Sequence, residues 1–214
     1  MKGILGLLRL SSRESKSQSS GQDHNDSVFF STAFAEQGVD LAMLAPWEAR
    51  AAEVGAKRLA PNRGGKLLQA LWAKDKYMAH LEKDAVKRME QFFDFAQVPA
   101  NRDLIRQDEY GNFMIVLLEG SIAIDRLQPW GEQMRLAETR PGDILGEMSL
   151  LDSGIRFSAC TTLTDCEIAV LSAEAMDEMM DRDPQLAASL VALLARKLSL
   201  RLRAVSARLS DHQT

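Results

Sequence analysis

The feature that most constrains the fold is a series of short apolar or alternating runs in the middle of the chain. In order they are FDFAQVPA, DLIR, NFMIVLLEG, SIAIDRL, EQMRLAET, FSACTT and CEIAVLS, between residues 93 and 172. Turn-forming stretches such as DEYGN, QPWG, RPGD and DSG separate them. Many short strands at this spacing predict a β-sandwich or a closed antiparallel roll.

The chain before this β region is expected to be a polar tail followed by helices. Residues 1–27, which include SSRESKSQSSGQDHNDS, predict a disordered tail, because this composition buries too little apolar surface to order itself. Residues 28–83 predict a helical extension. DLAMLAPWEARAAEV can form a helix around Pro46, and apolar residues recur at three- and four-residue steps from Lys66 to Phe93. Between these two segments, APNRGGK predicts a break.

Residues 84–209 should form the β-roll and the helices that close it. Ser172 is a favourable N-cap for a short helix, SAEAMDEMMDR. Asp183 and Pro184 are typical of a helix start, and a long helix should run from there to about Leu209. The predicted fold class is therefore α+β: an antiparallel β-roll, or jelly roll, flanked by N-terminal helices and a long C-terminal helix.

Composition excludes several kinds of function. The net charge of −4 argues against a general nucleic-acid binder, and two cysteines without a CxxC spacing are typical of a reduced, cytoplasmic protein. No apolar run reaches the roughly 18 residues of a membrane-spanning helix. The histidines, His24, His80 and His212, lie outside the predicted roll. The roll therefore lacks the imidazoles of a cupin-type metal enzyme and the base of a nucleophilic hydrolase. We expect a non-catalytic chain without a metal.

The segment PGDILGEMSLLDSGIRFSACTT, residues 141–162, has the chemistry of an anion site. Gly146 lets the backbone approach a ligand closely. The stretch EMSLL, which contains Met148 and Ser149, is long enough for one helical turn, whose free N–H groups favour a phosphate.

The charged residues of this segment suit the two halves of a nucleotide. Arg156 offers a planar fork for two phosphate oxygens, and Ser158 adds a hydroxyl or a backbone N–H. Glu147 cannot meet a phosphate favourably, but it can accept a hydrogen bond from a sugar hydroxyl. The alternative is a Glu147–Arg156 salt bridge that closes a surface loop and contributes about 0–1 kcal/mol. The spacing alone does not decide between the two.

Residues 84–207 resemble the cyclic nucleotide-binding domain of the catabolite activator protein and of kinase regulatory subunits. LIRQDEYGNFMIVLLEGSIAI is similar to the family's first hairpin region, and RPGDILGEMSLL is similar to the G-D-x-x-G-E segment that opens its phosphate-binding cassette. Arg156 stands where the family's phosphate arginine stands. CEIAVLSAEAMDEMMDRDPQL and LLARKLSLRL resemble the strand and two helices that close that domain.

The resemblance implies a cyclic nucleotide in the roll. Its ribose 2′-hydroxyl would bind Glu147, and its phosphate would bind Arg156 and nearby amides, including those of Gly146 and Ser158. Cyclic AMP is the expected ligand, with cyclic GMP and cyclic di-GMP as alternatives. The long helix would cover the base, and ligand binding would shift the helices relative to the roll.

The sequence departs from the family's pattern at several positions. Asp108 replaces a glycine at a turn, where aspartate tolerates a left-handed backbone. Phe157 follows the arginine, where the family has Ala, Ser or Thr; it has no side-chain donor and has the bulk to crowd the ligand pocket. Lys197 and Arg201 stand near the family's adenine-reading positions. They are expected to meet a second phosphate or a guanine edge, or else to form a solvated basic stripe.

The expected function is a cyclic nucleotide-sensing regulatory protein of signal transduction that controls an unidentified partner protein. Five residues follow Leu209, so no C-terminal helix-turn-helix is expected and direct DNA binding is disfavoured. The apolar stripe of the 184–209 helix predicts a homodimer seam, although packing on the roll gives the same pattern. Two alternatives stay open. One is a ligand-free scaffold of the same fold, which Phe157 favours, and the other is a transcription-regulator relative that has lost its DNA-binding domain.

Overall fold

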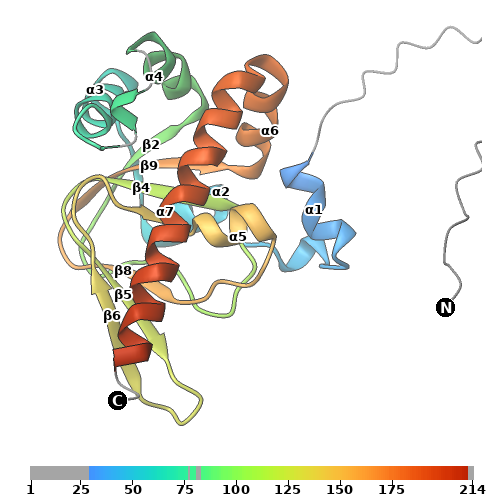
Figure 1. Cartoon of the computed structure of the whole chain (residues 1–214), viewed down its shortest axis with the longest axis vertical. Helices are drawn as coiled ribbons and strands as arrows, with labels where there is room; N and C mark the ends of the chain where they lie inside the picture. The colour runs from blue at the N-terminus through green and yellow to red at the C-terminus, as the bar shows by residue number, and fades with distance from the viewer. Residues whose placement is uncertain (1–28, 77, 81–82, 212–214) are drawn as a thin grey trace, which may run out of the picture.

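The computed structural model describes residues 29–211 except 77, 81 and 82, so the tail predicted over residues 1–27 lies outside the described residues. Two antiparallel sheets form a roll, with strand orders β1-β2-β9-β4-β7 and β3-β8-β5-β6 (Figure 1). The strands are β1 Lys57–Arg58, β2 Asp94–Val98, β3 Asp103–Ile105, β4 Phe113–Glu119, β5 Ile122–Leu127, β6 Gln133–Glu138, β7 Ile144–Leu145, β8 Ala159–Thr162 and β9 Cys166–Ser172. Each predicted strand is present, and β1 and β7 are additions that the sequence did not signal.

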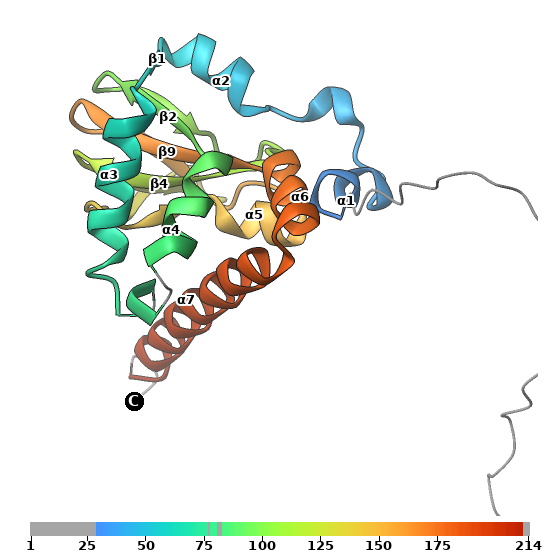
Figure 2. The ribbon, with the colours of Figure 1, turned by 90° about the horizontal axis from the view of Figure 1, so that it is seen from above.

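Helices surround the roll (Figure 2). They are α1 Phe30–Glu36, η1 Leu41–Met43, α2 Trp47–Val54, α3 Pro61–Trp72, η2 Met78–His80, α4 Lys83–Met89, η3 Glu90–Phe92, α5 Glu147–Asp152, α6 Ala173–Arg182 and α7 Pro184–Asp211. Figure 2 shows α3 and α4 beside β2, β9 and β4, and α7 running from α6 past α5 and α4 to the C-terminus. No helix in the described part of the chain is long and apolar enough to cross a membrane.

Strand β4 divides the apolar interior into two clusters. Its alternate residues Met114, Val116 and Leu118 pack with the helices α3, α4, α6 and α7. The intervening residues Phe113, Ile115 and Leu117 pack inside the roll with β9 and with Trp47 of α2. Burial on both faces explains why NFMIVLLEG is a continuous apolar run rather than an alternating one.

The predicted break at APNRGGK is wrong. These residues begin α3, with Pro61 at its first position, where the missing N–H has no helical partner to lose. Gly64 and Gly65 are buried within the helix. A Cβ at Gly64 would lie 2.2 Å from Cδ1 of Phe95 in β2. Gly64 therefore allows close packing of the helix against the sheet, and neither glycine ends the helix.

The two C-terminal helices begin where the sequence predicts. Ser172 Oγ accepts a hydrogen bond from Ala175 N at 3.1 Å, and Asp183 Oδ1 accepts one from Leu186 N at 3.2 Å. The apolar stripe of α7 then divides into two parts. Leu186, Leu190, Leu193 and Leu194 are buried in the chain's own core, whereas Leu202 and Val205 are exposed. The first half of the stripe is thus explained by packing on the roll, and the homodimer stays a prediction.

Candidate functional site

The predicted anion-binding segment forms the turn and short helix that its sequence indicates. Gly146 has a φ of +73°, and α5 begins at the next residue and ends at Asp152; Ser153, which follows, also has a positive φ. Glycine adopts this conformation more easily than residues with a Cβ, so both the backbone conformation and the close approach of Arg156 favour glycine at position 146. Asp108 has a φ of +65°, which confirms that aspartate accepts the left-handed turn there. We call residues 146–158 the cassette.

The side chain of Arg156 points into the protein, and 3% of the residue's surface is exposed. Its Nη1 donates to the carbonyl of Gly146 at 2.8 Å, and its Nη2 donates to the carbonyl of Phe113 at 2.7 Å. The guanidinium carbon lies 4.6 Å from the centre of the Phe113 ring. Glycines make room for this group, since a Cβ at Gly111 or Gly146 would lie 2.7 or 2.6 Å from its nitrogens.

Burial changes the acid–base chemistry of Arg156. Loss of water lowers the pKa of Arg156 to about 10, so the guanidinium stays cationic at neutral pH but is poorly solvated. A phosphate would supply the missing negative charge. A buried cation with a depressed pKa in a loop of this kind is a candidate anion-binding group.

Glu147 is also buried, with 4% exposed, and its carboxylate forms an ion pair with Arg201 of α7. Arg201 Nη2 also donates to the carbonyl of Ile144 at 3.1 Å. The alternative of a surface salt bridge between Glu147 and Arg156 does not hold, because both residues are buried and Glu147 pairs with the long helix. Glu147, the carboxylate expected to accept a hydrogen bond from the ribose, therefore links the cassette to α7.

The other predicted site residues lie in different surroundings. Phe157 is 50% exposed, and the guanidinium carbon of Arg126 in β5 lies 4.0 Å from the centre of its ring. Ser149 is buried and Met148 is exposed on α5, and Ser158 is half-buried.

Lys197 does not join the cassette in this structure. Its Nζ lies 2.7 Å from a carboxylate oxygen of Asp75, between α3 and η2. Phe113 and Ile144, in contrast, belong to the site but were missed, because they act through backbone carbonyls and a ring face that no motif marks.

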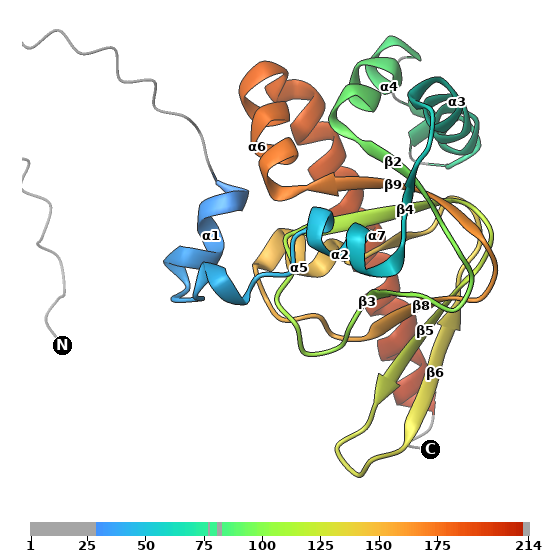
Figure 3. The ribbon, with the colours of Figure 1, turned by 180° about the vertical axis from the view of Figure 1, so that it is seen from behind.

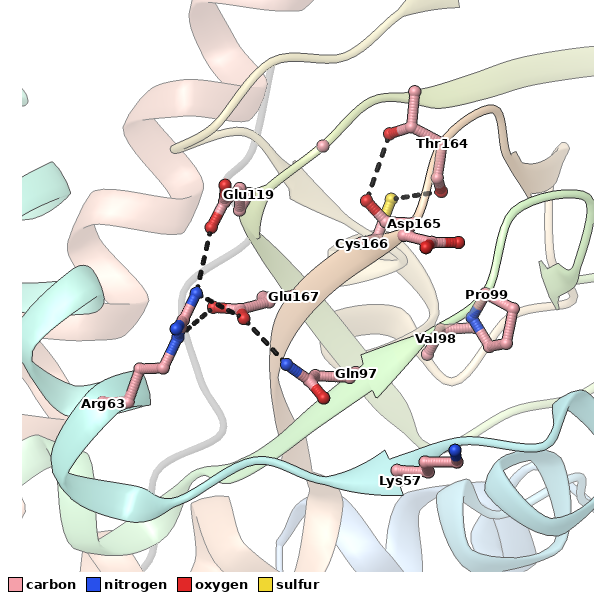
Figure 4. Close-up of a pocket in the computed structure, with 11 residues that line it drawn as sticks. Lys57, Arg63, Gln97, Val98, Pro99, Glu119, Thr164, Asp165, Cys166 and Glu167 are labelled. Carbon is pink, nitrogen blue, oxygen red and sulfur yellow. Dashed lines mark hydrogen bonds and ion pairs between the residues drawn. The ribbon is translucent and has the colours of Figure 1, made fainter.

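A separate pocket of about 540 Å³ lies between α3, β1 and the turns that follow β2, β4 and β8 (Figure 4). Three of its charged side chains, Arg63, Glu119 and Glu167, pair within the chain. Arg63 binds Glu167 at 2.7 Å and Glu119 at 3.4 Å, and Glu167 accepts a hydrogen bond from Gln97 at 2.9 Å. The pocket takes no residue from the cassette, so it is distinct from the predicted site.

The two thiols are predicted to be unreactive in the folded chain. Burial raises the pKa of Cys160 to about 12, and burial also raises the pKa of Cys166. At pH 8 both thiols therefore stay protonated and covered. Ellman's reagent should modify neither within minutes in the native chain, and both at once in 6 M guanidinium chloride. Rapid labelling of the native chain would contradict the buried placement.

Comparison with known proteins agrees with this geometry. Residues 95–183, which include Glu147 and Arg156, match the family model described as a cyclic nucleotide-binding domain. The cyclic AMP receptor protein of Thermus thermophilus is 32% identical over 107 residues, which cover 50% of this chain and 50% of that protein. The chain thus spans about half the length of the curated relatives it matches.

Solved structures share the fold. A cyclic nucleotide-binding domain from Methylobacillus flagellatus aligns with a TM-score of 0.66 and 21% identity, over 72% of this chain and 86% of that one. The catabolite activator protein of Thermus thermophilus aligns with a TM-score of 0.53 and 28% identity, over 64% of this chain and 63% of that one. Residues 95–183 of the β-roll therefore match the cyclic nucleotide-binding domain family, as the sequence resemblance predicted.

Proposed function

We propose that this chain is a non-catalytic cytoplasmic sensor of a cyclic nucleotide, with cyclic AMP as the first candidate, and that it controls a partner protein through α7. Arg156 would hold the cyclic phosphate together with amides of the cassette, and Glu147 would accept the ribose 2′-hydroxyl. The observation that carries the proposal is the ion pair between Glu147 and Arg201. It joins the ligand-reading carboxylate to the helix that would carry the signal.

The coupling follows from competition for one carboxylate. A ribose hydroxyl that hydrogen-bonds to Glu147 replaces the guanidinium of Arg201, and α7 then loses a contact with the cassette. A ligand that binds the released arrangement more tightly shifts the population toward it. The phosphate meanwhile neutralises Arg156, which the structure holds charged in a poorly solvated place.

Isothermal titration of the full chain with cyclic AMP, cyclic GMP and cyclic di-GMP tests the proposal. We expect cyclic AMP to bind at one site per chain and more tightly than the other two. Failure of all three to bind at millimolar concentration would reject the sensor.

Replacing Arg201 by alanine should tighten cyclic AMP binding about threefold to fivefold, because the ligand no longer displaces a half-exposed ion pair worth up to ~1 kcal/mol. Arg203→Ala, two residues along the same helix and exposed, is the matched control and should leave affinity unchanged. Weaker binding in Arg201→Ala would instead mean that Arg201 contacts the ligand, as the sequence alone predicts.

A ligand-free scaffold is the second candidate. It is favoured by the partners that Glu147 and Arg156 already have within the chain. In either case the exposed Leu202 and Val205 of α7 support a proposed homodimer, which light scattering can measure. The names of the curated relatives describe transcriptional regulators, so a role in transcription through a partner belongs to the same proposal.

A further inference from the structure

Residues 29–58 form a strap across the roll that lies outside the matched residues 95–183. Figure 3 shows it starting with α1 beside α6, continuing through α2 on the face opposite α7, and joining the sheet as β1. The proposed function assigns it no role. We call it the N-terminal strap.

Both ends of the N-terminal strap are fixed to the roll. At its start, the carboxylate of Asp177 in α6 accepts hydrogen bonds from Phe29 N at 2.9 Å, Phe30 N at 2.7 Å and Ser31 N at 2.8 Å. Phe34 is fully buried below them. At its end, β1 pairs with β2. A buried carboxylate that satisfies several backbone donors is a firm anchor.

Between its ends, the strap touches both sides of the cassette. Gln37 Nε2 donates to the carbonyl of Asp152, the last residue of α5, at 2.9 Å. Ala45 N donates to the carbonyl of Tyr110 at 2.9 Å, and Tyr110 in turn forms an antiparallel bridge with Ile155. The strap therefore contacts the cassette at the end of its helix and, through one residue, just before Arg156.

A further contact of the strap runs through two aromatic rings. The centres of the Trp47 and Phe113 rings lie 5.7 Å apart at an interplanar angle of 62°. The guanidinium of Arg156 stacks on the Phe113 ring and donates a hydrogen bond to the Phe113 carbonyl. The strap also pairs Arg50 with Glu109, whose carbonyl accepts a hydrogen bond from Arg156 N at 2.8 Å. Trp47 thus packs against the Phe113 ring on which the guanidinium stacks, and Arg50 holds Glu109, which binds the backbone N–H of Arg156.

We propose that Trp47 is a positioning residue for Arg156, and that the N-terminal strap holds the phosphate-binding group in place. A binding group works best when the packing of its neighbours locks its orientation. The ring of Trp47 restricts Phe113, and Phe113 restricts the guanidinium from two directions. The consequence for nucleotide binding rests on the proposed function, whereas the consequence for the order of Arg156 does not.

The first test measures binding. Trp47→Ala should weaken cyclic AMP binding about tenfold or more, and Trp47→Phe, which restores a ring, should bind within about threefold of the original chain. Val54→Ala is the matched control, because Val54 is buried in the same cluster and on the same helix but has no ring to stack. It should lose stability without losing affinity. Equal affinity in Trp47→Ala and Val54→Ala would overturn the proposal.

The second test needs no nucleotide. The guanidinium signal of Arg156 in a proton–nitrogen correlation spectrum, assigned by its loss in Arg156→Gln, should be sharp and protected from exchange. Trp47→Ala should shift and broaden it, whereas Trp47→Phe and Val54→Ala should not. If Trp47→Ala unfolds, Trp47→Leu keeps apolar bulk without a ring and takes its place. An unchanged signal would overturn the positioning role, whereas a changed signal in a chain that binds no nucleotide would overturn only the proposed function.

Discussion

Replacing Arg156 by alanine is expected to weaken cyclic AMP binding by about 30- to 1000-fold, which corresponds to roughly 2–4 kcal/mol. The guanidinium is the buried cation of the cassette, and its two hydrogen bonds to the carbonyls of Gly146 and Phe113 fix its plane. In the alanine variant, a bound phosphate would lose its charge-assisted hydrogen bonds to the guanidinium, and water would not replace them at a buried position. Isothermal titration of the variant with cyclic AMP measures the loss.

The alanine variant also leaves two carbonyls without their donor, so a loss of binding has to be separated from a loss of folding. Arg156→Gln removes the charge and shortens the side chain but keeps an amide donor, so its thermal midpoint should fall less than that of Arg156→Ala while most of the affinity is lost. Arg182→Ala is the surface control, since Arg182 is half exposed and pairs with Glu178 within α6. Normal affinity in Arg156→Gln would show that the phosphate site lies elsewhere.

Gly64→Ala should be among the most destabilising single-methyl changes in the chain. The new Cβ would lie 2.2 Å from Cδ1 and 2.3 Å from Cγ of Phe95, both in a buried ring that has no free space to move into. Either α3 or β2 has to shift. Overpacking of this kind costs about 2–3 kcal/mol of unfolding free energy, and the thermal midpoint should fall by roughly 4–12 °C.

The neighbouring glycine provides the control for that experiment. A Cβ at Gly65 would meet Oε2 of Glu90 at 2.3 Å, but this is the end of a flexible side chain and can turn away. Alanine also favours the helix over glycine, so Gly65→Ala should change the unfolding free energy by no more than about 1 kcal/mol. Equal thermal midpoints for the two variants would mean that α3 does not pack on Phe95 as described.

The strands could be predicted because their information is local. A run such as SIAIDRL carries its own alternation and its own turns, and Ser172 and Asp183 carry their own helix caps. The cassette was found for the same reason, since Gly146 and Arg156 lie on one short segment. These are interactions whose partners are close together in the sequence.

What could not be predicted depends on contacts between distant segments. The segment APNRGGK has the composition of a break between helices, and only the packing of Phe95 against Gly64 explains why these residues are helical. The partner of Glu147 depends on the angle at which α7 crosses the cassette, which the periodicity of α7 does not encode. Strand β7 has two residues and exists only because β4 supplies its hydrogen bonds. Local pattern therefore identified the segment that carries Glu147 and Arg156 but not the distant contacts that hold these two side chains.

The lengths of the strands at the sheet borders bear on how the protein behaves at high concentration. β1 and β7 border one sheet with two residues each, and β3 borders the other with three, so none of them offers a long row of open backbone groups. β6 borders the second sheet with six residues, all exposed. A strand of another molecule can add to such a row and start aggregation. Charged side chains such as Arg135 and Glu138 oppose that addition, so solubility should depend on this single border more than on any other.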